Sequence, residues 1–490
     1  MDSNDTEQAT SSNTGNETNN ETLIEKKPWI KPSITPLRSG LLNKMGTARH
    51  TIWRDNIDGI PINKLTEDYG SPLFVISEHT LRKNAKRIKT AFSTRYPKVQ
   101  FGWSYKTNYL GAVCNTLHQE GALAEVVSKF EYEKARQLGV PGDCILFNGP
   151  YKPRDILERA IKEGAHIHID HLDELYLIED ITNTLDKVID VTIRLNFDTG
   201  YTEQWSRFGF NVESGQALDA AWRIVSSKQL NLVGLHSHIG TFVLEPLAYQ
   251  TQVKIMCEFM NEVETKTGCT IRYLDIGGGF ASMNSLQGIY LPPEQVVPSI
   301  EQYAESICDT LLELTHDRET RGCGRPTLVL ETGRAVVDDA EVLISTVFAN
   351  KHLPDGRRAV VLDAGVNHLF TAFWYNHDVF PTRHLAGRPE ETVLYGPLCM
   401  NIDVMRNSIM LPPLDVGDTL VFSPVGAYNN TQWLQFIEYR PNVVMVHENG
   451  DVSLVRAAEN LEIVTQQEQI PTHLKDVYPT GAPRDILKEH

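Results

Sequence analysis

Between residues 71 and 335, short apolar runs alternate with longer amphipathic stretches, and this rhythm constrains the fold more than any other feature. Runs such as PLFVIS, VQFGWSY and TLVLETG have the length of strands, whereas EHTLRKNAKRIKTAFSTRY has the length and pattern of a helix. Strands that alternate with helices form βαβ units and a parallel sheet. Some nine such runs before about residue 335 predict an α/β fold with a (β/α)8 TIM barrel, with one of the runs misjudged as a strand.

The pattern of apolar runs changes after residue 336. Strand-like segments such as RAVVLDAG, ETVLYGPLC and DTLVFSPVGAY follow one another, with turn signals such as PDG and ENG between them. We therefore expect a mostly-β domain over residues 336–468, joined by an N-terminal segment at 46–70. Residues 1–45 are predicted to form a disordered or irregular tail, and residues 469–490 a C-terminal tail.

Charge and composition exclude several classes of partner. The formal net charge of −17 argues against general binding to nucleic acid or to anionic membranes. No apolar run approaches the ~18–20 residues that span a bilayer, and the N-terminus lacks the pattern of a secretory signal. Seven cysteines without a CxxC pair suit reduced thiols. These features predict a cytoplasmic protein.

The stretch FGWSYKTNYL places Lys106 at the end of an apolar run. Lysine usually lies on a solvated face, so the residue could simply mark a strand leaving the core. Alternatively, Lys106 is a partly desolvated amine that reacts with a carbonyl group. This stretch alone leaves both interpretations open.

Two other strand ends carry groups suited to an anion or to a ring nitrogen. Gly277, Gly278 and Gly279 follow the run YLDI, where they could bring backbone N–H groups to a phosphate or form a tight turn. In LVLETGR, the Glu331 carboxylate could hold a pyridinium nitrogen and Arg334 a phosphate, or the two could form an exposed salt bridge.

Other motifs have equally open interpretations. His236 and His238 in GLHSHIGT alternate along a strand, so they share a face and could bind a metal, stack on a flat cofactor ring, or pack in the core. Cys399 in GPLC could be a buried thiol, and Tyr428 in GAY an ordinary strand tyrosine.

Taken together, the motifs resemble one family: the fold type III, alanine-racemase-like decarboxylases that use pyridoxal 5'-phosphate (PLP). This family includes the diaminopimelate, ornithine and arginine decarboxylases, and the chain is most similar to the diaminopimelate branch. The resemblance covers residues 46–465. Along it, Lys106, EVVSKFE, HIGT, DIGGG, ETGR, LDAG, GPLC and GAY occur in the family's order.

The resemblance implies catalytic roles for four residues. Lys106 would bind the cofactor aldehyde through a C=N bond, with burial and nearby cations lowering the pKa of its amine. His238 would stack on the cofactor ring, and Glu331 would keep the ring nitrogen protonated. Cys399 would reach across a homodimer interface and protonate the substrate, so that the two subunits share their active sites.

The resemblance also implies a cofactor cradle and a substrate site, with no metal. The residues expected to bind PLP are Lys106, Glu125, His238, Thr241, Gly277, Gly278, Gly279, Glu331, Arg334 and Tyr428, with Arg207 as a further supporting residue. The residues expected to bind substrate are Arg334, Asp363, Tyr375, Met400 and Tyr428.

Several positions depart from the pattern of diaminopimelate decarboxylases. Met400 follows Cys399 where that branch has glutamate, and Thr371 stands where it has arginine, although Tyr375 remains. Loss of the arginine removes the partner of a distal carboxylate, at a cost of about 2–5 kcal/mol. Asp363 could still meet a distal amine. We therefore expect a decarboxylase whose substrate is an amino acid other than meso-diaminopimelate, either free or linked to a carrier.

Four alternatives stay open on the sequence. The protein could be a genuine diaminopimelate decarboxylase or one for ornithine or another basic amino acid. It could also be an amino-acid racemase, a catalytically inactive regulatory homologue, or a barrel hydrolase with a metal at His236 and His238.

Overall fold

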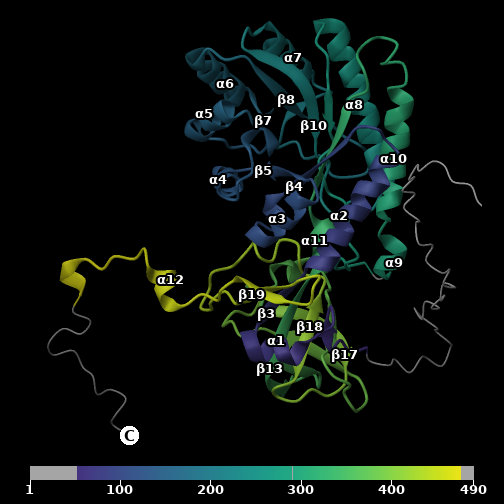
Figure 1. The fold of residues 1–490 in the computed structure, drawn as a ribbon. Coiled ribbons are helices and arrows are strands. Elements are labelled where there is room, and N and C mark those ends of the chain that lie inside the picture. Colours follow the sequence, from purple (N-terminus) through teal and green to yellow (C-terminus); the bar gives the residue numbers. More distant parts are fainter. Residues whose placement is uncertain (1–51, 290, 476–490) are drawn as a thin grey trace, which may run out of the picture. The chain divides into compact units, whose positions relative to one another are not determined.

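Parallel strands close into an eight-stranded barrel in the described part of the chain, which confirms the predicted α/β barrel. The structure is a computed structural model that describes residues 52–289 and 291–475. Pairing of β10 with both β8 and β11 closes the ring (Figure 1). In ring order, the strands are β4 (Val99–Ser104), β5 (Leu123–Val126), β6 (Ile145–Phe147), β7 (His166–Ile169), β8 (Ile189–Asn196), β10 (Leu230–Ser237), β11 (Tyr273–Asp275) and β12 (Thr327–Thr332).

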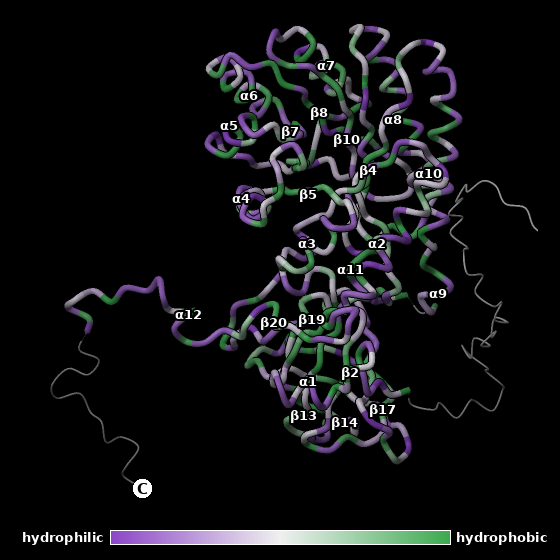
Figure 2. The backbone as a smooth tube through the Cα atoms, in the orientation of Figure 1, coloured by the Kyte–Doolittle hydropathy of each residue, from purple (hydrophilic) through white to green (hydrophobic). Residues whose placement is uncertain are grey.

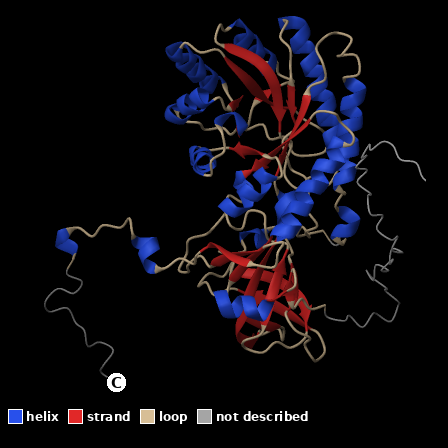
Figure 3. Cartoon of the chain, in the orientation of Figure 1, coloured by secondary structure: helices blue, strands red, loops and turns tan. Residues whose placement is uncertain are grey.

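Helices connect the barrel strands and cover their outer side (Figure 3). Their ends carry the expected signals: at the start of α10, the Ser299 hydroxyl accepts from the Gln302 amide while the Gln302 side chain accepts from the Ser299 amide. The helices are α2 (Glu78–Ser93), α3 (Gly111–Gln119), α4 (Lys129–Gln137), α5 (Arg154–Glu163), α6 (Leu172–Leu185), α7 (Gln216–Ser226), α8 (Pro246–Thr267), α9 (Pro293–Val296), α10 (Ile300–Leu314) and α11 (Arg334–Val337). A short strand, β9 (Phe210–Asn211), extends β8.

A second, mixed sheet forms the C-terminal β domain, as predicted. Its longest strand, β13 (Glu341–His352), pairs with β3, β14 and β18. The other strands are β14 (Arg358–Leu362), β15 (Asp378–Pro381), β16 (Glu390–Tyr395), β17 (Val404–Leu411), β18 (Thr419–Ser423), β19 (Asn442–Val446) and β20 (Val452–Arg456).

One predicted barrel strand belongs to this second sheet. The run PLFVIS forms β3 (Leu73–Ser77), which lies inside the range expected for the barrel but pairs with β13 and β19. All five residues of β3 are buried. A continuously buried apolar strand has the same pattern in either sheet, so the sequence could not distinguish the two.

Residues 52–70 also pack on the β domain. They form β1 (Asn56–Ile57), β2 (Ile60–Pro61) and α1 (Ile62–Tyr69). Ile57, Ile62 and Leu65 share a small core with residues of β3 and β13. After β20 the chain continues into the short helix α12 (Leu461–Thr465), whereas most of the predicted tails lies outside the described residues.

Hydropathy follows this architecture (Figure 2). Apolar residues follow the strands, whereas α4 is mostly hydrophilic. In residues 52–289 and 291–475, no helix combines the length and the apolar character needed to cross a membrane.

The assignment of β3 to the second sheet predicts a stability effect. Leu73 is fully buried in the small core beside Ile344, so Leu73→Ala should destabilise the β domain by about 2–5 kcal/mol. Urea denaturation should therefore show a lower midpoint. The matched change Leu172→Ala removes a 45% exposed side chain and should alter stability by no more than about 0.5 kcal/mol. Equal midpoints for the two variants would contradict the assignment.

Candidate active site

A cavity of about 570 Å³ opens where the barrel strands end, and the β domain contributes part of its wall. This end of a barrel presents its connecting loops and is where barrel enzymes place their chemistry. The cavity brings together Lys106, Thr241, Glu331, Arg334, Tyr375 and Tyr428 from the predicted site, along with His238, Gly278 and Gly279.

Lys106 lies in the short 3-10 turn η1 (Tyr105–Thr107), directly after the first barrel strand, and pairs with Glu125 of β5. Its Nζ donates to the two carboxylate oxygens at 3.0 and 2.9 Å. Ser104 Oγ donates to Glu125 Oε2 at 2.5 Å. The lysine side chain is 36% exposed, whereas Glu125 is completely buried. Lys106 therefore lines the cavity while its amine pairs with a carboxylate that is buried in the barrel.

The pKa of Lys106 differs from the sequence-based expectation. Burial lowers the pKa of the amine, but the negative charges of Glu125 and Glu331 outweigh it and raise the pKa above its ordinary value. The expected depression of this pKa is therefore wrong for this arrangement. A carboxylate, rather than a cation, is in direct contact with the amine.

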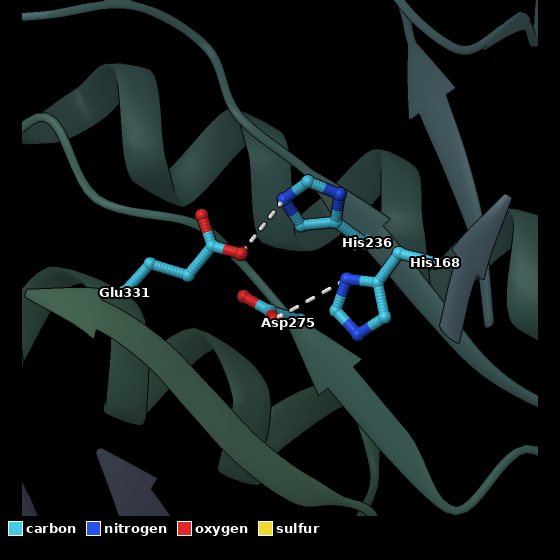
Figure 4. A group of neighbouring side chains, drawn as sticks. All are labelled: His168, His236, Asp275 and Glu331. Carbon is cyan, nitrogen blue, oxygen red and sulfur yellow. Dashed lines mark ion pairs between the residues drawn. The ribbon is translucent and has the colours of Figure 1, made fainter. Parts of the chain in front are cut away.

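Glu331 extends from β12 into a buried polar cluster (Figure 4). Its Oε1 accepts a hydrogen bond from Asn148 Nδ2 at 2.7 Å and lies 3.4 Å from His236 Nε2. Burial raises the pKa of a carboxyl group, but His236 and Lys106 hold that of Glu331 well below its usual range. The structure therefore keeps a negative charge at the end of β12.

His168 and Asp275 complete this cluster (Figure 4). Ligand-type atoms of His168, His236, Asp275 and Glu331 lie within 4.8 Å of one another, a spacing that approaches a metal site. However, the Asn148 amide also donates to Glu331 Oε1, and a hydrogen-bond donor at that oxygen disfavours a cation beside it. The hydrolase hypothesis paired His236 with His238, yet His238 is not part of this cluster.

The triple glycine packs closely against its neighbours. The Gly277 N–H donates to Asp275 Oδ1 at 2.9 Å, and the Gly278 N–H donates to His238 Nδ1 at 3.1 Å. A Cβ at Gly279 would lie 2.3 Å from the Gly240 carbonyl oxygen, and its φ is +92°. Of the three amides, only that of Gly279 has no hydrogen-bond partner among the described residues.

His238 is held as a neutral imidazole at the cavity wall. Burial lowers its pKa to about 3, and its Nδ1 accepts from the backbone, so the ring proton lies on Nε2. The Trp205 ring contacts it edge to face at 5.2 Å. The ring orientation is therefore fixed from two sides.

Arg334 has the features of an anion site. Its guanidinium lies over the rings of Tyr375 and Tyr428, at 4.7 and 5.0 Å from the centroids. Nε and Nη1 are buried without a hydrogen-bond partner. Buried donors of a charged group normally have partners. Arg334 is therefore prepared to bind an anion in the cavity.

Tyr428 is positioned by contacts with the lysine loop. Its backbone has a φ of +70°, which is strained for a non-glycine residue, and its N–H donates to the Thr107 carbonyl at 2.8 Å. Thr431 Oγ1 donates to the Lys106 carbonyl at 2.8 Å. These bonds join a loop of the β domain to the turn that carries the lysine.

Six predicted residues lie outside the lining of this cavity: Glu125, Arg207, Gly277, Asp363, Cys399 and Met400. Cys399 is exposed and Met400 is partly exposed. The Asp363 carboxylate accepts from Ser345 Oγ at 2.7 Å and from the Thr346 amide at 2.8 Å, so neighbours of its own domain hold it. Arg207 is exposed, with its guanidinium 5.1 Å from the centroid of the Phe208 ring.

Sequence reasoning missed several residues that line or support the cavity. Asn148 follows β6 directly, Arg194 lies within β8, and Asp275 ends β11. The positions of Asn148 and Asp275 at the ends of barrel strands were the available signal, because that edge faces the cavity. Trp205 comes from a loop after β8 and had no comparable signal.

These features define a class of protein. A barrel with a lysine after its first strand, a buried carboxylate, and an arginine with two buried donors that lack hydrogen-bond partners corresponds to a fold type III PLP enzyme.

Comparison with protein families gives the particular assignment. Residues 79–338 match the pyridoxal binding domain of the pyridoxal-dependent decarboxylases, and residues 305–426 match the C-terminal sheet domain of that family. The chain belongs to this family and is a PLP-dependent carboxy-lyase. Membership favours decarboxylation over the racemase, regulator and hydrolase alternatives.

Individual relatives agree with the family match. The chain is 29% identical to a diaminopimelate decarboxylase of Methanothermobacter thermautotrophicus, over 85% of this chain and 96% of the relative. It is 28% identical to the Bacillus subtilis diaminopimelate decarboxylase, over 84% and 94% of the two chains. The crystal structure of diaminopimelate decarboxylase from M. jannaschii superposes with a TM-score of 0.78 at 27% identity, covering 87% of this chain and 99% of that one.

The residues of the cavity fit PLP. The cofactor combines an aldehyde, a basic ring nitrogen and a phosphate, and the wall offers an amine, a buried anionic carboxylate and an arginine with two unpaired donors. The volume of about 570 Å³ lies within the range of cofactor pockets.

The Lys106–Glu125 pair predicts a change in lysine reactivity. Glu125→Gln removes the nearest negative charge and should lower the pKa of Lys106 by about one unit or more. Below that pKa, acylation of Lys106 in cofactor-free protein should become about tenfold faster, as measured by peptide mass spectrometry. Glu262→Gln, which removes the surface partner of Lys266, should leave the Lys106 rate unchanged. Equal Lys106 rates in wild type and Glu125→Gln would contradict this account.

Proposed function

We propose that the protein decarboxylates an amino acid through PLP bound at Lys106. The observation that carries the proposal is the convergence of Lys106, Glu331 and Arg334 on a single cavity. These three side chains suit the aldehyde, the ring nitrogen and the phosphate of the cofactor, respectively. The family match supports the same reaction.

Bound PLP supplies a protonated ring that accepts the electron pair left at the α-carbon when CO2 departs. Lys106 would hold the cofactor through Nζ. The Glu331 carboxylate holds a proton at the ring nitrogen by charge pairing. His238, neutral and fixed by Gly278, supports a face of the ring. Arg334, Thr241, Tyr428 and the Gly279 amide hold the phosphate, because these groups line the cavity with donors.

The proposed role of Cys399 requires a second copy of the chain. Its thiol is exposed and outside the cavity of its own chain. We propose that it enters the cavity of a second copy in a homodimer and donates the proton that the α-carbon receives. Met400, also outside the cavity, would approach the substrate in the same way, whereas the Asp363 carboxylate is held by Ser345 and Thr346 and would have to leave them to do so.

The proposed substrate is an amino acid other than meso-diaminopimelate. Thr371 lines the cavity where the related enzymes have arginine, and its hydroxyl is bonded to Asn429 and His377 at 2.9 Å. The cavity arginines have other partners: Arg194 faces Asp170 and the Phe208 ring, and Arg334 is assigned to the phosphate of the cofactor. Apolar and aromatic residues make up much of the remaining wall, namely Trp205, Phe242, Leu286 and Trp374. Among the described residues, a distal carboxylate therefore lacks a dedicated partner.

Diaminopimelate is the second candidate substrate. The relatives reported above are diaminopimelate decarboxylases, and an M. jannaschii structure that is 26% identical to this chain is a co-complex with L-lysine. A second copy could also contribute a charged group that this chain lacks at Thr371.

Catalysis and subunit sharing can be tested together. Lys106→Ala should abolish CO2 release and the absorbance of bound PLP, and Cys399→Ala should lower turnover strongly while it retains bound PLP. Mixing the two variants should restore about a quarter of wild-type activity, because half of randomly formed dimers carry one intact site. Cys323→Ala should behave as wild type. Full activity of Lys106→Ala would overturn the catalytic role of Lys106, and no recovery on mixing would overturn shared sites.

A substrate panel tests specificity. CO2 evolution from L- and D-amino acids, including lysine, ornithine, arginine and neutral amino acids, should identify a substrate preferred over meso-diaminopimelate by about 30-fold or more in kcat/KM. This factor follows from an unpaired buried charge costing at least about 2 kcal/mol. If meso-diaminopimelate gives the highest kcat/KM, the second candidate is correct. Optical rotation measured in parallel would detect racemisation.

A further inference from the structure

Three carboxyl groups are buried together below the cavity. Glu125 is 0% exposed, Asp275 1% and Glu331 3%. Buried carboxyl groups that interact this closely do not all ionise, so the protein must determine which of them bears the charge. Which group is ionised matters for a cofactor enzyme, because a carboxyl group beside the ring nitrogen holds the proton of that nitrogen only when it is ionised.

The hydrogen-bond donors around the three groups differ. Glu125 has Lys106 and Ser104. Glu331 Oε1 accepts from Asn148 Nδ2 at 2.7 Å, whereas His236 Nε2 lies 3.4 Å from Glu331 Oε1 and also 3.4 Å from Asn148 Nδ2. Asp275 accepts at Oδ1 from the Gly277 N–H, whereas its Oδ2 is buried without a hydrogen-bond partner. Asn148 thus gives Glu331 a donor that Asp275 lacks.

The orientation of Asn148 is determined by a second bond. Its Oδ1 accepts from the Gly149 N–H at 3.0 Å. Rotating the amide by half a turn would place its NH2 group against that N–H and its oxygen against the Glu331 carboxylate. Both contacts would then be repulsive, so the donor must face Glu331.

We propose that Asn148 is a positioning residue that keeps the buried negative charge on Glu331 rather than on Asp275. This inference rests on the proposed function, in which Glu331 holds the proton of the cofactor ring. Asn148 would affect cofactor binding through its hydrogen bond to Glu331.

The pKa shifts within the cluster agree with a negative charge on Glu331 and not on Asp275. The pKa of Glu331 lies well below its usual range, mainly because of His236 and Lys106, whereas burial and the charge of Glu331 raise that of Asp275 well above it. Burial lowers the pKa values of His168 and His236, while the charge of Glu331 acts to raise both. The titratable and charged groups facing Glu331 are Lys106, Glu125, His168, Arg194, His236, His238 and Asp275.

The test measures the PLP dissociation constant of cofactor-free protein by absorbance titration. Asn148→Asp has nearly the same shape and keeps the acceptor for Gly149, but it replaces the donor to Glu331 with a carboxyl group. PLP binding should weaken about 10- to 100-fold in mildly alkaline buffer, as expected for a lost hydrogen bond to a charged group. The loss should shrink as the pH falls, because the introduced carboxyl group then takes up a proton and can donate it to Glu331. A purely structural defect would not recover in this way.

A second variant removes the competing carboxyl group. Asp275→Asn keeps an acceptor for Gly277, and in the Asn148→Asp background it should restore most of the lost affinity. Asn148→Ser, which keeps a shorter donor, should bind with intermediate affinity and serves if Asn148→Asp does not fold. The matched control is Asn231→Asp, whose amide donates to Asp190 at 3.1 Å on the surface; its PLP affinity should equal that of wild type.

The outcomes separate this inference from the proposed function. If wild type binds PLP and Asn148→Asp binds it equally well at every pH, Asn148 has no such role. Failure of Asp275→Asn to restore affinity would likewise overturn the assignment of charge. If wild type itself neither binds PLP nor releases CO2, the proposed function is wrong.

Discussion

The site depends on keeping negative charge inside the barrel, where water cannot stabilise it. Glu125 and Glu331 are almost inaccessible, and an isolated carboxylate in such a place would take up a proton. Glu125 is matched by Lys106, and Glu331 by the Asn148 amide and the nearby His236 ring. These contacts also determine where the amine and the Glu331 carboxylate stand relative to each other. Charge and geometry in the cavity therefore come from the same few contacts.

The two domains form this cavity together. The barrel supplies Lys106, His238, Glu331 and Arg334, while the β domain supplies Tyr375 and Tyr428. Asn108, just after the lysine turn, donates to the Gly426 carbonyl and to the buried carboxyl group of Glu341, which begins β13. The loop that carries the lysine is thus bonded to both loops and strands of the second domain. A barrel alone would lack one wall of the site and part of the support of its lysine.

Much of the architecture could be predicted from periodicity, because barrel strands and helices have different lengths and patterns. The same reasoning failed for β3, whose apolar run resembles a barrel strand but completes the other sheet. The cavity unites most of the residues predicted by family resemblance. Asn148 and Asp275 were missed because a single amide or carboxyl group at a strand end has many possible roles, and only its neighbours distinguish them.

The sequence by itself determined the order of strands and helices, the presence of a β domain, and the set of motifs that defines the family. These properties follow from local patterns of apolar residues and from short motifs. The tertiary structure decided that the pKa of Lys106 is raised, that Gly278 holds His238, and that Asp363 and Cys399 lie outside their own cavity. Those properties depend on distances between residues that are far apart in the chain, because electrostatic and hydrogen-bonding energies change steeply over a few ångströms.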